Sequence, residues 1–480
     1  MLSLILSVSL SLVSREDVLL QRVRQHGGGS SLRAGVVNGV RGLVLTRDAC
    51  AGDVLLEVPL TLTICDTGES TDMPLPGSAP QWTSGLPWNV QLALTALERR
   101  SAGDDDAFLS SWPSEPPALP QRCDAEELAL ASDRSLELKA EEAFFWLDTV
   151  YWEAREAHDN VAPLAAADGA PVASNGATLF TGGFPSAEAF NGAMEFVWSR
   201  CLRLSAGVHG VRRLLVPYLD LANHEAVPSC LYAFSSGASC GPAIRLHAAR
   251  ALRAGDEATI TYGEHNNAHF ALYYGFVPSY NPFDSIDVTI GDVLSVLPPD
   301  QLPAEPEDCW PQGPFALRAD GPDGALLAAL TRLLPPPPPP SRCVEAAAAR
   351  AVASLAAAIE QTLWGGDGLD SVEAGIEADE QELAKPSNSS GSLSDRAALL
   401  VRVRLSRRRL LASVRRTMLE AAEGFDADPE GAAAALSERI RSLEPPSIYP
   451  ALDALPVEEL TAWESQAWDW EAAAWRRAQQ

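Results

Sequence analysis

Short apolar runs broken by glycine and polar residues make two parts of the chain strand-like. In the first part, residues 33–64, apolar runs at 36–37, 42–45 and 54–58 alternate with turn-forming positions. A similar pattern returns between residues 214 and 262. Runs of this length bounded by turn residues are typical of β-strands. We therefore predict two groups of short strands that lie far apart in the sequence.

Apolar residues at helical spacing dominate the interval between these groups and most of the chain after residue 287. Segments rich in Gly, Pro, Ser or Ala at 66–87 and 160–183 predict loops, and the prolines at 335–340 predict an exposed polyproline linker. The predicted helices cover residues 89–99, 125–138, 140–158, 186–200, 343–363, 394–423 and 460–477. In the last of them, Trp463, Ala467, Trp470 and Ala474 form a stripe that we expect to dock onto the body of the protein.

The order of these elements predicts an α+β protein with more than one domain, as is usual for a chain of 480 residues. Strands with a helical insert at about 89–200 form one domain over residues 32–285. A separate all-α domain, which contains the proline linker, is expected over residues 286–480.

The charge balance argues against a DNA-binding protein. Asp and Glu number 64 against 36 Lys and Arg, which gives a formal net charge of −28. Binding to DNA requires a cationic surface that displaces counterions from the phosphates, so we expect no DNA partner. The arginine-rich stretch at 402–416 has two interpretations. It either grips an acidic partner or nucleic acid, or forms a solvated basic face that balances an acidic domain.

The cysteines offer no metal-binding motif. They lie at positions 50, 65, 123, 201, 230, 240, 309 and 343, and no two form a CxxC pair of the kind that zinc fingers and thioredoxin-like sites use. We therefore expect no metal. Cys230 and Cys240 pair across a hairpin if the compartment is oxidising; otherwise all the cysteines are reduced and mostly buried thiols.

The first 14 residues, MLSLILSVSLSLVS, have the length of the apolar part of a signal peptide. They lack a basic start, Ser14 gives only a weak cleavage site, and the run is too short to cross a bilayer as a helix. The segment is either a targeting segment or a poorly ordered start. The compartment, cytoplasmic or organellar, stays open, and we expect no membrane span in the mature protein.

Three segments carry candidate chemistry, and each has a plain structural interpretation of its own. In the first, NGVRGLVLTRD at 38–48, Gly39 and Gly42 allow a close backbone approach to a ligand, or simply form a turn between strands. The second joins Arg200 to LVPYLDLANH at 215–224. The third, AGDEATITYGEHNN at 254–267, continues as AHFALYYGFV and lies in an interval, 218–280, that holds six of the eight tyrosines.

Asn223 and His224 in the second segment are unusual because they directly follow an apolar strand. They are either hydrogen-bonded core groups or part of a metal site with Asp220 and Glu225. A metal would need further ligands at workable spacing, and the sequence has no His-x-x-x-His pair.

Together and in this order, the segments resemble the SET fold over residues 32–284. The entry strand RGLVLTRD, the Ser199-Arg200 pair, the Asp-x-x-Asn-His motif and the TYG…N…YGF run are similar to one branch of SET methyltransferases. That branch contains the Rubisco large-subunit lysine methyltransferases and the actin-histidine methyltransferases. The resemblance implies small β-sheets with a knot-like crossing at Asn223 and His224, a helical insert, and a C-terminal helical substrate-binding domain.

The resemblance also implies S-adenosylmethionine as cofactor and a role for each motif residue. Tyr262 becomes the catalytic tyrosine whose hydroxyl orients the acceptor nitrogen, and Tyr274 the second tyrosine of the substrate channel. The implied cofactor-binding residues are Gly39, Val40, Arg41, Arg200, Asp220, Asn223 and His224. The sequence departs from the family's motifs at two places: the glycine turn reads Gly-Val-Arg-Gly, and His265 and Asn266 replace residues that are commoner in the family. Neither departure removes a reacting group.

This chemistry makes physical sense for a lysine substrate. A free lysine has a pKa of about 10.4, so it is almost wholly protonated at neutral pH and cannot attack a methyl group. A narrow channel lined by tyrosines lowers that pKa by desolvation and holds the amine close to the methyl donor.

The sequence lacks the signature of the other common methyltransferase fold, the Rossmann architecture. Its Gly-x-Gly-x-Gly loop would have to follow a buried strand. The glycine clusters at 27–29 and 365–368 do not.

We therefore expect a protein-lysine methyltransferase that acts as a monomer on a non-histone protein. One alternative is a histidine methyltransferase of the actin type; Leu202, two residues after Arg200, argues against it because histidine-directed relatives tend to carry Asn there. The other is a catalytically silent SET scaffold that binds a partner, against which the intact Tyr262, Asn223 and His224 argue.

Overall fold

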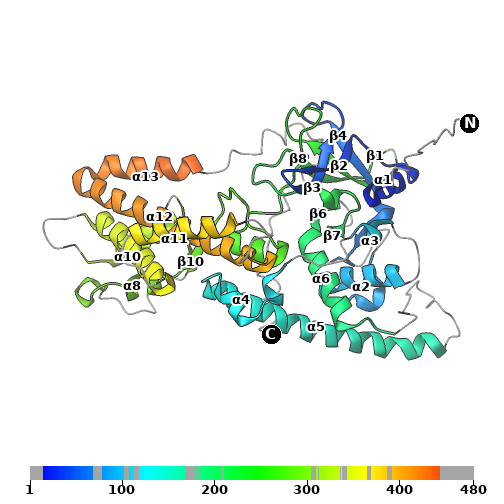
Figure 1. Ribbon diagram of the computed structural model, residues 1–480, viewed down its shortest axis with the longest axis horizontal. Helices are drawn as coiled ribbons and strands as arrows, with labels where there is room; N and C mark the ends of the chain where they lie inside the picture. Colours follow the sequence, from blue (N-terminus) through cyan, green and yellow to red (C-terminus); the bar gives the residue numbers. More distant parts are fainter. Residues whose placement is uncertain are drawn as a thin grey trace, which may run out of the picture. The chain divides into compact units, whose positions relative to one another are not determined.

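The computed structural model forms two compact units (Figure 1). The first is built from residues within Met1–Pro116 and Trp146–Gly263, and the second from residues within Pro117–Phe145 and Glu264–Ser447. The structure describes residues 14–68, 78–101, 107–112, 118–167, 180, 183–206, 210–238, 240–303, 310–311, 313–319, 321–335, 337, 343–364, 369–385 and 392–443. The domain boundaries expected from the sequence stay predictions.

The described part of the first unit contains three small sheets whose neighbouring strands are antiparallel. Their strand orders are β1-β4-β9-β8, β2-β3 and β5-β7-β6. The strands are β1 (Gly29–Ser30), β2 (Leu32–Val37), β3 (Val40–Leu45), β4 (Val54–Pro59), β5 (Ile64–Cys65), β6 (Leu202–Ser205), β7 (Val211–Leu215), β8 (Cys230–Ser235) and β9 (Ala243–Ala248). Both predicted groups of strands are thus present, and they pair with each other.

Two segments that are remote in sequence pair with each other beside β3, where the sequence predicted a knot-like crossing. The backbone N–H of Ile260 donates to the carbonyl of Asn223 at 2.9 Å, and that of Glu225 donates to the carbonyl of Ile260 at 3.0 Å. On its other side the same segment pairs with β3, since Ala258 N–H donates to the carbonyl of Leu43 at 2.8 Å. Residues 256–260 therefore lie between β3 and the Asn223–His224 motif.

The start of α6, one of the helices of the first unit, follows from the sequence. α6 begins after Ser186, whose side chain accepts from the N–H of Ala189, as expected of an N-cap. α5 is one continuous helix, so the predicted break near Lys139 and the predicted loop at residues 160–167 are wrong, while most of the loop predicted over 168–183 lies outside the described residues. Good helix formers without Gly or Pro run from Arg134 to Ala162 and sustain it. The helices are α1 (Arg15–Gln25), α2 (Trp88–Ser101), α3 (Ala107–Ser111), α6 (Ala187–Arg200) and most of α5 (Arg134–Ala167), with short 3₁₀ turns at Leu60–Leu62, Gln81–Thr83 and Leu219–Leu221.

The second unit is mainly helical, and its core forms where alanines of α10 meet larger residues of α12. Its helices are α4 (Ala125–Ala129), α7 (Asn267–His269), the π-helical turn Phe270–Tyr274, α8 (Ile290–Ser295), α9 (Gly324–Leu333), α10 (Val344–Trp364), α11 (Leu369–Leu383), α12 (Asp395–Ala427) and α13 (Pro429–Leu443). Short strands β10 (Ser285–Val288), β11 (Phe315–Arg318) and β12 (Gly321–Pro322) and 3₁₀ turns at Pro120–Arg122 and Pro299–Gln301 accompany them. The sequence did not predict these three strands.

Most arginines of the basic stretch lie on α12 and pair with acidic side chains of the same unit. Arg404 and Arg408 pair with Asp379 of α11, and Arg415 pairs with Glu360 of α10 at 2.9 Å. The stretch therefore balances acidic helices of its own unit, but these three arginines are 14–21% exposed and so do not form the solvated face that was expected.

Three further expectations concern a disulfide bond, a membrane span and segments near the ends of the chain. Cys230 and Cys240 are both free thiols. Among the described residues, no helix is both long and apolar enough to span a membrane. The predicted helix 460–477 with its tryptophans, residues 1–13, and most of the proline run lie outside the described residues.

Candidate active site

The first glycine of the entry segment forms the tip of a hairpin. Asn38 and Gly39 both have positive φ angles, 51° and 82°, and Val37 pairs with Val40 on either side of them. This is the two-residue Asn-Gly turn that right-twisted strands favour. Val40 is 56% exposed, and a β-carbon at Gly39 would meet no atom within 4 Å. Of the two glycines, Gly39 therefore serves the turn.

Gly42 allows a close approach between protein groups. A β-carbon there would lie 2.4 Å from Oε1 of Glu257 and 2.7 Å from Nδ2 of Asn223. The Asn223 amide uses the space to donate to the carbonyl of Arg41 at 3.1 Å and to Glu257 at 2.7 Å. Because both amide hydrogens are used in this way, Asn223 can offer a ligand only its acceptor oxygen.

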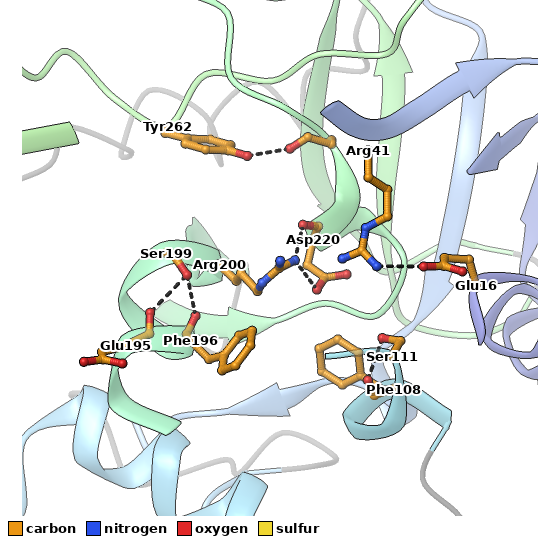
Figure 2. A network of polar contacts seen from close by, with 11 residues as sticks. Glu16, Arg41, Phe108, Ser111, Glu195, Phe196, Ser199, Arg200, Asp220 and Tyr262 are labelled. Carbon is orange, nitrogen blue, oxygen red and sulfur yellow. Dashed lines mark hydrogen bonds and ion pairs between the residues drawn. The ribbon is translucent and has the colours of Figure 1, made fainter. Parts of the chain in front are cut away.

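Arg200 and Asp220 form a buried ion pair at the end of α6 (Figure 2). Nη1 of Arg200 donates to the carbonyl of Asp220 at 2.9 Å and to its Oδ2 at 3.0 Å. The Asp220 side chain is only 1% exposed. Two buried atoms of this pair, Nε of Arg200 and Oδ1 of Asp220, have no hydrogen-bond partner among the residues that the structure describes. The pair thus keeps one donor and one acceptor unused.

Burial and charge act in opposite directions on Asp220. Burial raises the pKa of its carboxyl above the ordinary value, while the guanidinium groups of Arg200 and Arg41 oppose that rise. The backbone just before it is strained, because Tyr218 has a φ of 70°. Such strain in a non-glycine residue persists only where the surrounding structure holds it, and it is common at functional sites.

A hydrogen bond between the backbone of Tyr262 and the ring of His224 links these two residues. The N–H of Tyr262 donates to Nδ1 of His224 at 3.1 Å, and the Tyr262 hydroxyl donates to the carbonyl of Ala222 at 2.7 Å (Figure 2). Burial lowers the pKa of His224 to about 4, so the ring is neutral and carries its proton on Nε2. Burial also raises the pKa of Tyr262 to about 12, which keeps the phenol protonated.

The structure brings Arg41, Arg200, Asp220, Asn223, His224 and Tyr262 together in the first unit. Tyr274 belongs to the second unit, where it ends the π-helical turn and lies beside the rings of Phe270 and Phe276. Within the described residues, no group of three or more His, Cys, Asp or Glu side chains is placed to hold a metal ion. Glu257 and Ala222 were missed by the sequence analysis.

A polar cluster in the second unit fixes the segment that follows Tyr262. Asn267 donates from its backbone and its side chain to Asp284, both at 2.9 Å, and also from its side chain to Ser406 of α12 at 2.8 Å. Asn281 donates to the Asn267 side chain at 2.8 Å. The asparagines of the predicted motif therefore tie residues 265–284 to α12.

Comparison with known proteins identifies the fold. No family model matches the sequence. Mouse SET domain-containing protein 4 is 33% identical over 84 residues, a stretch that spans 18% of this chain and 18% of the mouse protein. The SET domain of LSMT bound to lysine and AdoHcy matches with a TM-score of 0.52 and 19% identity, covering 87% of this chain and 93% of that one. Rubisco LSMT bound to sinefungin and monomethyllysine matches with a TM-score of 0.51 and 18% identity, over 87% and 94% of the two chains. The chain has the SET-domain fold of Rubisco LSMT, with a helical C-terminal region.

Proposed function

We propose that this chain is an S-adenosylmethionine-dependent protein methyltransferase that methylates a lysine side chain of another protein. The observation that carries the proposal is the buried Arg200–Asp220 pair, which keeps an unused donor and an unused acceptor near Tyr262. Solved structures of Rubisco LSMT, whose fold this chain has, hold AdoMet, AdoHcy or lysine.

The unused atoms match the amino-acid end of the cofactor. That end carries a carboxylate and an ammonium group, which need a donor and an acceptor respectively. Nε of Arg200 is a donor on a cation, and Oδ1 of Asp220 is an acceptor on an anion. A buried polar atom without a partner costs about 1–3 kcal/mol, so a ligand that satisfies both is favoured. When bound, S-adenosylmethionine supplies an electrophilic methyl group on a positively charged sulfur.

Tyr262 is arranged to accept a hydrogen bond from an amine. Its own hydroxyl hydrogen is directed at the Ala222 carbonyl, so toward a substrate the oxygen can act only as an acceptor. An amine that donates an N–H to this oxygen has its nitrogen lone pair turned away from Tyr262. Holding that orientation is the main contribution the residue makes to the reaction.

The surroundings of Tyr262 favour a neutral amine. Burial penalises a charged ammonium at Tyr262. The nearby charges act in both directions, because the Arg200 guanidinium repels an ammonium while the Asp220 and Glu257 carboxylates attract it, so burial is the cause that favours the neutral amine. Lysine is the proposed acceptor rather than histidine because of Leu202, on β6. This residue is apolar and only 6% exposed, whereas histidine-directed relatives tend to carry Asn at that position. The silent-scaffold alternative leaves the paired Tyr262 and His224 without a role.

The direct test is transfer of a labelled methyl group. The purified protein is incubated with radiolabelled S-adenosylmethionine and a cell extract, and the labelled protein is digested and mapped by mass spectrometry. We expect label on a lysine, and none when the Arg200→Met variant is used. Label on histidine would overturn the assignment to lysine, and a complete lack of label together with a lack of AdoHcy binding would overturn the proposed function.

A further inference from the structure

An ion pair joins the first turn of α1 to the entry segment of the site. Nη1 of Arg41, on β3, lies 2.6 Å from Oε1 of Glu16. The two side chains are 34% and 16% exposed, so the pair is partly shielded from water. α1 itself is fixed in the unit, because Leu19, Leu20 and Val23 on its inner face are buried.

Arg41 also faces Asp220, which makes Glu16 the outer member of a row of charges. Burial raises the pKa of Asp220 and the Arg41 guanidinium partly offsets that rise, and Figure 2 shows the Asp220 carboxylate between the guanidinium groups of Arg200 and Arg41. The row therefore alternates in sign, from Arg200 through Asp220 and Arg41 to Glu16. Each member favours the charged form and the position of its neighbour.

Glu16 is suited to the outer position. Burial raises the pKa of its carboxyl, but its own backbone N–H and the Arg41 guanidinium outweigh burial and hold the pKa below its ordinary value. It is therefore ionised at neutral pH. Twenty-five residues separate Glu16 from Arg41, so nothing in the local sequence couples them.

We propose that Glu16 is a positioning residue for the cofactor site, which holds Arg41 against Asp220 and thereby keeps Asp220 and Arg200 in their binding arrangement. The inference rests on the proposed function, because it takes the Arg200–Asp220 pair as the place where the amino-acid end of the cofactor binds. It makes α1 part of the site through the contact of Glu16 with Arg41.

The test is a double-mutant cycle on AdoHcy affinity, measured by calorimetry on the full chain. The variants are Glu16→Gln, Arg41→Met and the combination of the two. We expect Glu16→Gln to weaken AdoHcy about 3- to 30-fold, as for coupled members of one network, and to add little once Arg41 is already Met. Asp17→Asn is the matched control, because it removes one charge from the same helix turn at an exposed position; it should change affinity less than twofold, within the usual range of a neutral surface change.

The outcomes separate this inference from the proposed function. Equal affinities for Glu16→Gln and Asp17→Asn, or effects of Glu16→Gln and Arg41→Met that simply add, would overturn the role of Glu16 and leave the proposed function standing. Failure of the unaltered protein to bind AdoHcy would overturn both. Thermal melting without AdoHcy is recorded for each variant, and Glu16→Asp, which keeps the charge, should recover part of the affinity if Glu16→Gln loses stability.

Discussion

Two of the buried Arg–Asp pairs, one in each unit, differ in how fully they are bonded. In the second unit, Arg407 donates to Asp133 at 2.6 Å and to the Ser285 carbonyl at 2.7 Å, and Asp133 also caps the start of α5. No buried polar atom of that pair lacks a partner. In the first unit, Arg200 and Asp220 each keep an unused atom.

This difference in bonding indicates that the two pairs have different roles. Desolvating an ion pair costs several kcal/mol per charge, which is repaid only when further hydrogen bonds saturate it. Arg407 and Asp133 are saturated by the protein alone and so serve the fold. Arg408 and Asp379 of the second unit also keep one unbonded buried atom each, so such an atom does not by itself mark a ligand site. The Arg200–Asp220 pair differs from them in lying close to Tyr262, and this is why we propose it as the ligand site.

Loss of the saturated pair should have the largest effect. Arg407→Leu leaves Asp133 buried without its counter-charge, so we expect the free energy of unfolding to fall by about 3–5 kcal/mol. Urea unfolding followed by circular dichroism measures this. A loss below about 1 kcal/mol, the value of an ordinary surface pair, would mean that the Arg407–Asp133 pair does not stabilise the fold.

Removal of the Tyr262 hydroxyl should act on the rate instead of on binding. We expect Tyr262→Phe to lower kcat by about 30- to 1000-fold, or roughly 2–4 kcal/mol of barrier, with AdoHcy affinity nearly unchanged. The interaction matters mainly while the amine is being aligned, so the loss appears in kcat. Tyr273→Phe, in the second unit, serves as the control; equal and small effects at both positions would show that Tyr262 is a packing residue.

Lowering the pH should reduce the free energy of unfolding of the first unit, because His224 is buried there in its neutral form. The native pKa of about 4 lies below the ordinary value of 6.5, so between these values the unfolded chain binds a proton that the native state does not. Stability that is fully present above pH 6.5 is therefore lost as pH falls toward 4, by roughly 1–2 kcal/mol at pH 5. Urea midpoints at pH 7.5 and pH 5 for His224→Asn should differ less than those of the unaltered protein. An identical pH response would contradict the assignment, and exposed His26→Asn is the control.

Loss of an exposed ion pair should have the smallest effect on the free energy of unfolding. Arg409 and Glu380 pair on the surface of the second unit with side chains 55% and 48% exposed. Arg409→Ala should change the free energy of unfolding by less than about 0.5 kcal/mol, because water screens such pairs. A change as large as that of Arg407→Leu would show that burial is not what distinguishes the two arginines of α12.

Local signals predicted much of this structure. The helical periodicity placed the starts of α6 and α12 correctly, and in the structure Ser186 and Ser394 cap these two helices. The Asp-x-x-Asn-His motif and Tyr262 were expected in one site, and the first unit brings them together.

Features that leave no mark on the hydrophobic periodicity were not predicted. The helix expected at 125–138 is interrupted because Ser132 has a positive φ and Asp133 caps a new helix, two local choices that the periodicity does not reveal. β12 has only two residues and thus no periodic pattern. Glu257 and Glu16 join the site through partners more than 20 residues away, which no local motif encodes.

The central claim is that the incompletely bonded pair of the first unit is the cofactor site. Its most direct test is the AdoHcy dissociation constant of Arg200→Lys and Arg407→Lys, measured by calorimetry in the presence and absence of a chelator. Lysine keeps the charge but lacks the guanidinium fork. The account predicts that Arg200→Lys weakens AdoHcy about 10-fold or more, that Arg407→Lys leaves its affinity within about twofold, and that the chelator has no effect. Equal affinities of the two variants, or binding that the chelator abolishes, would contradict it.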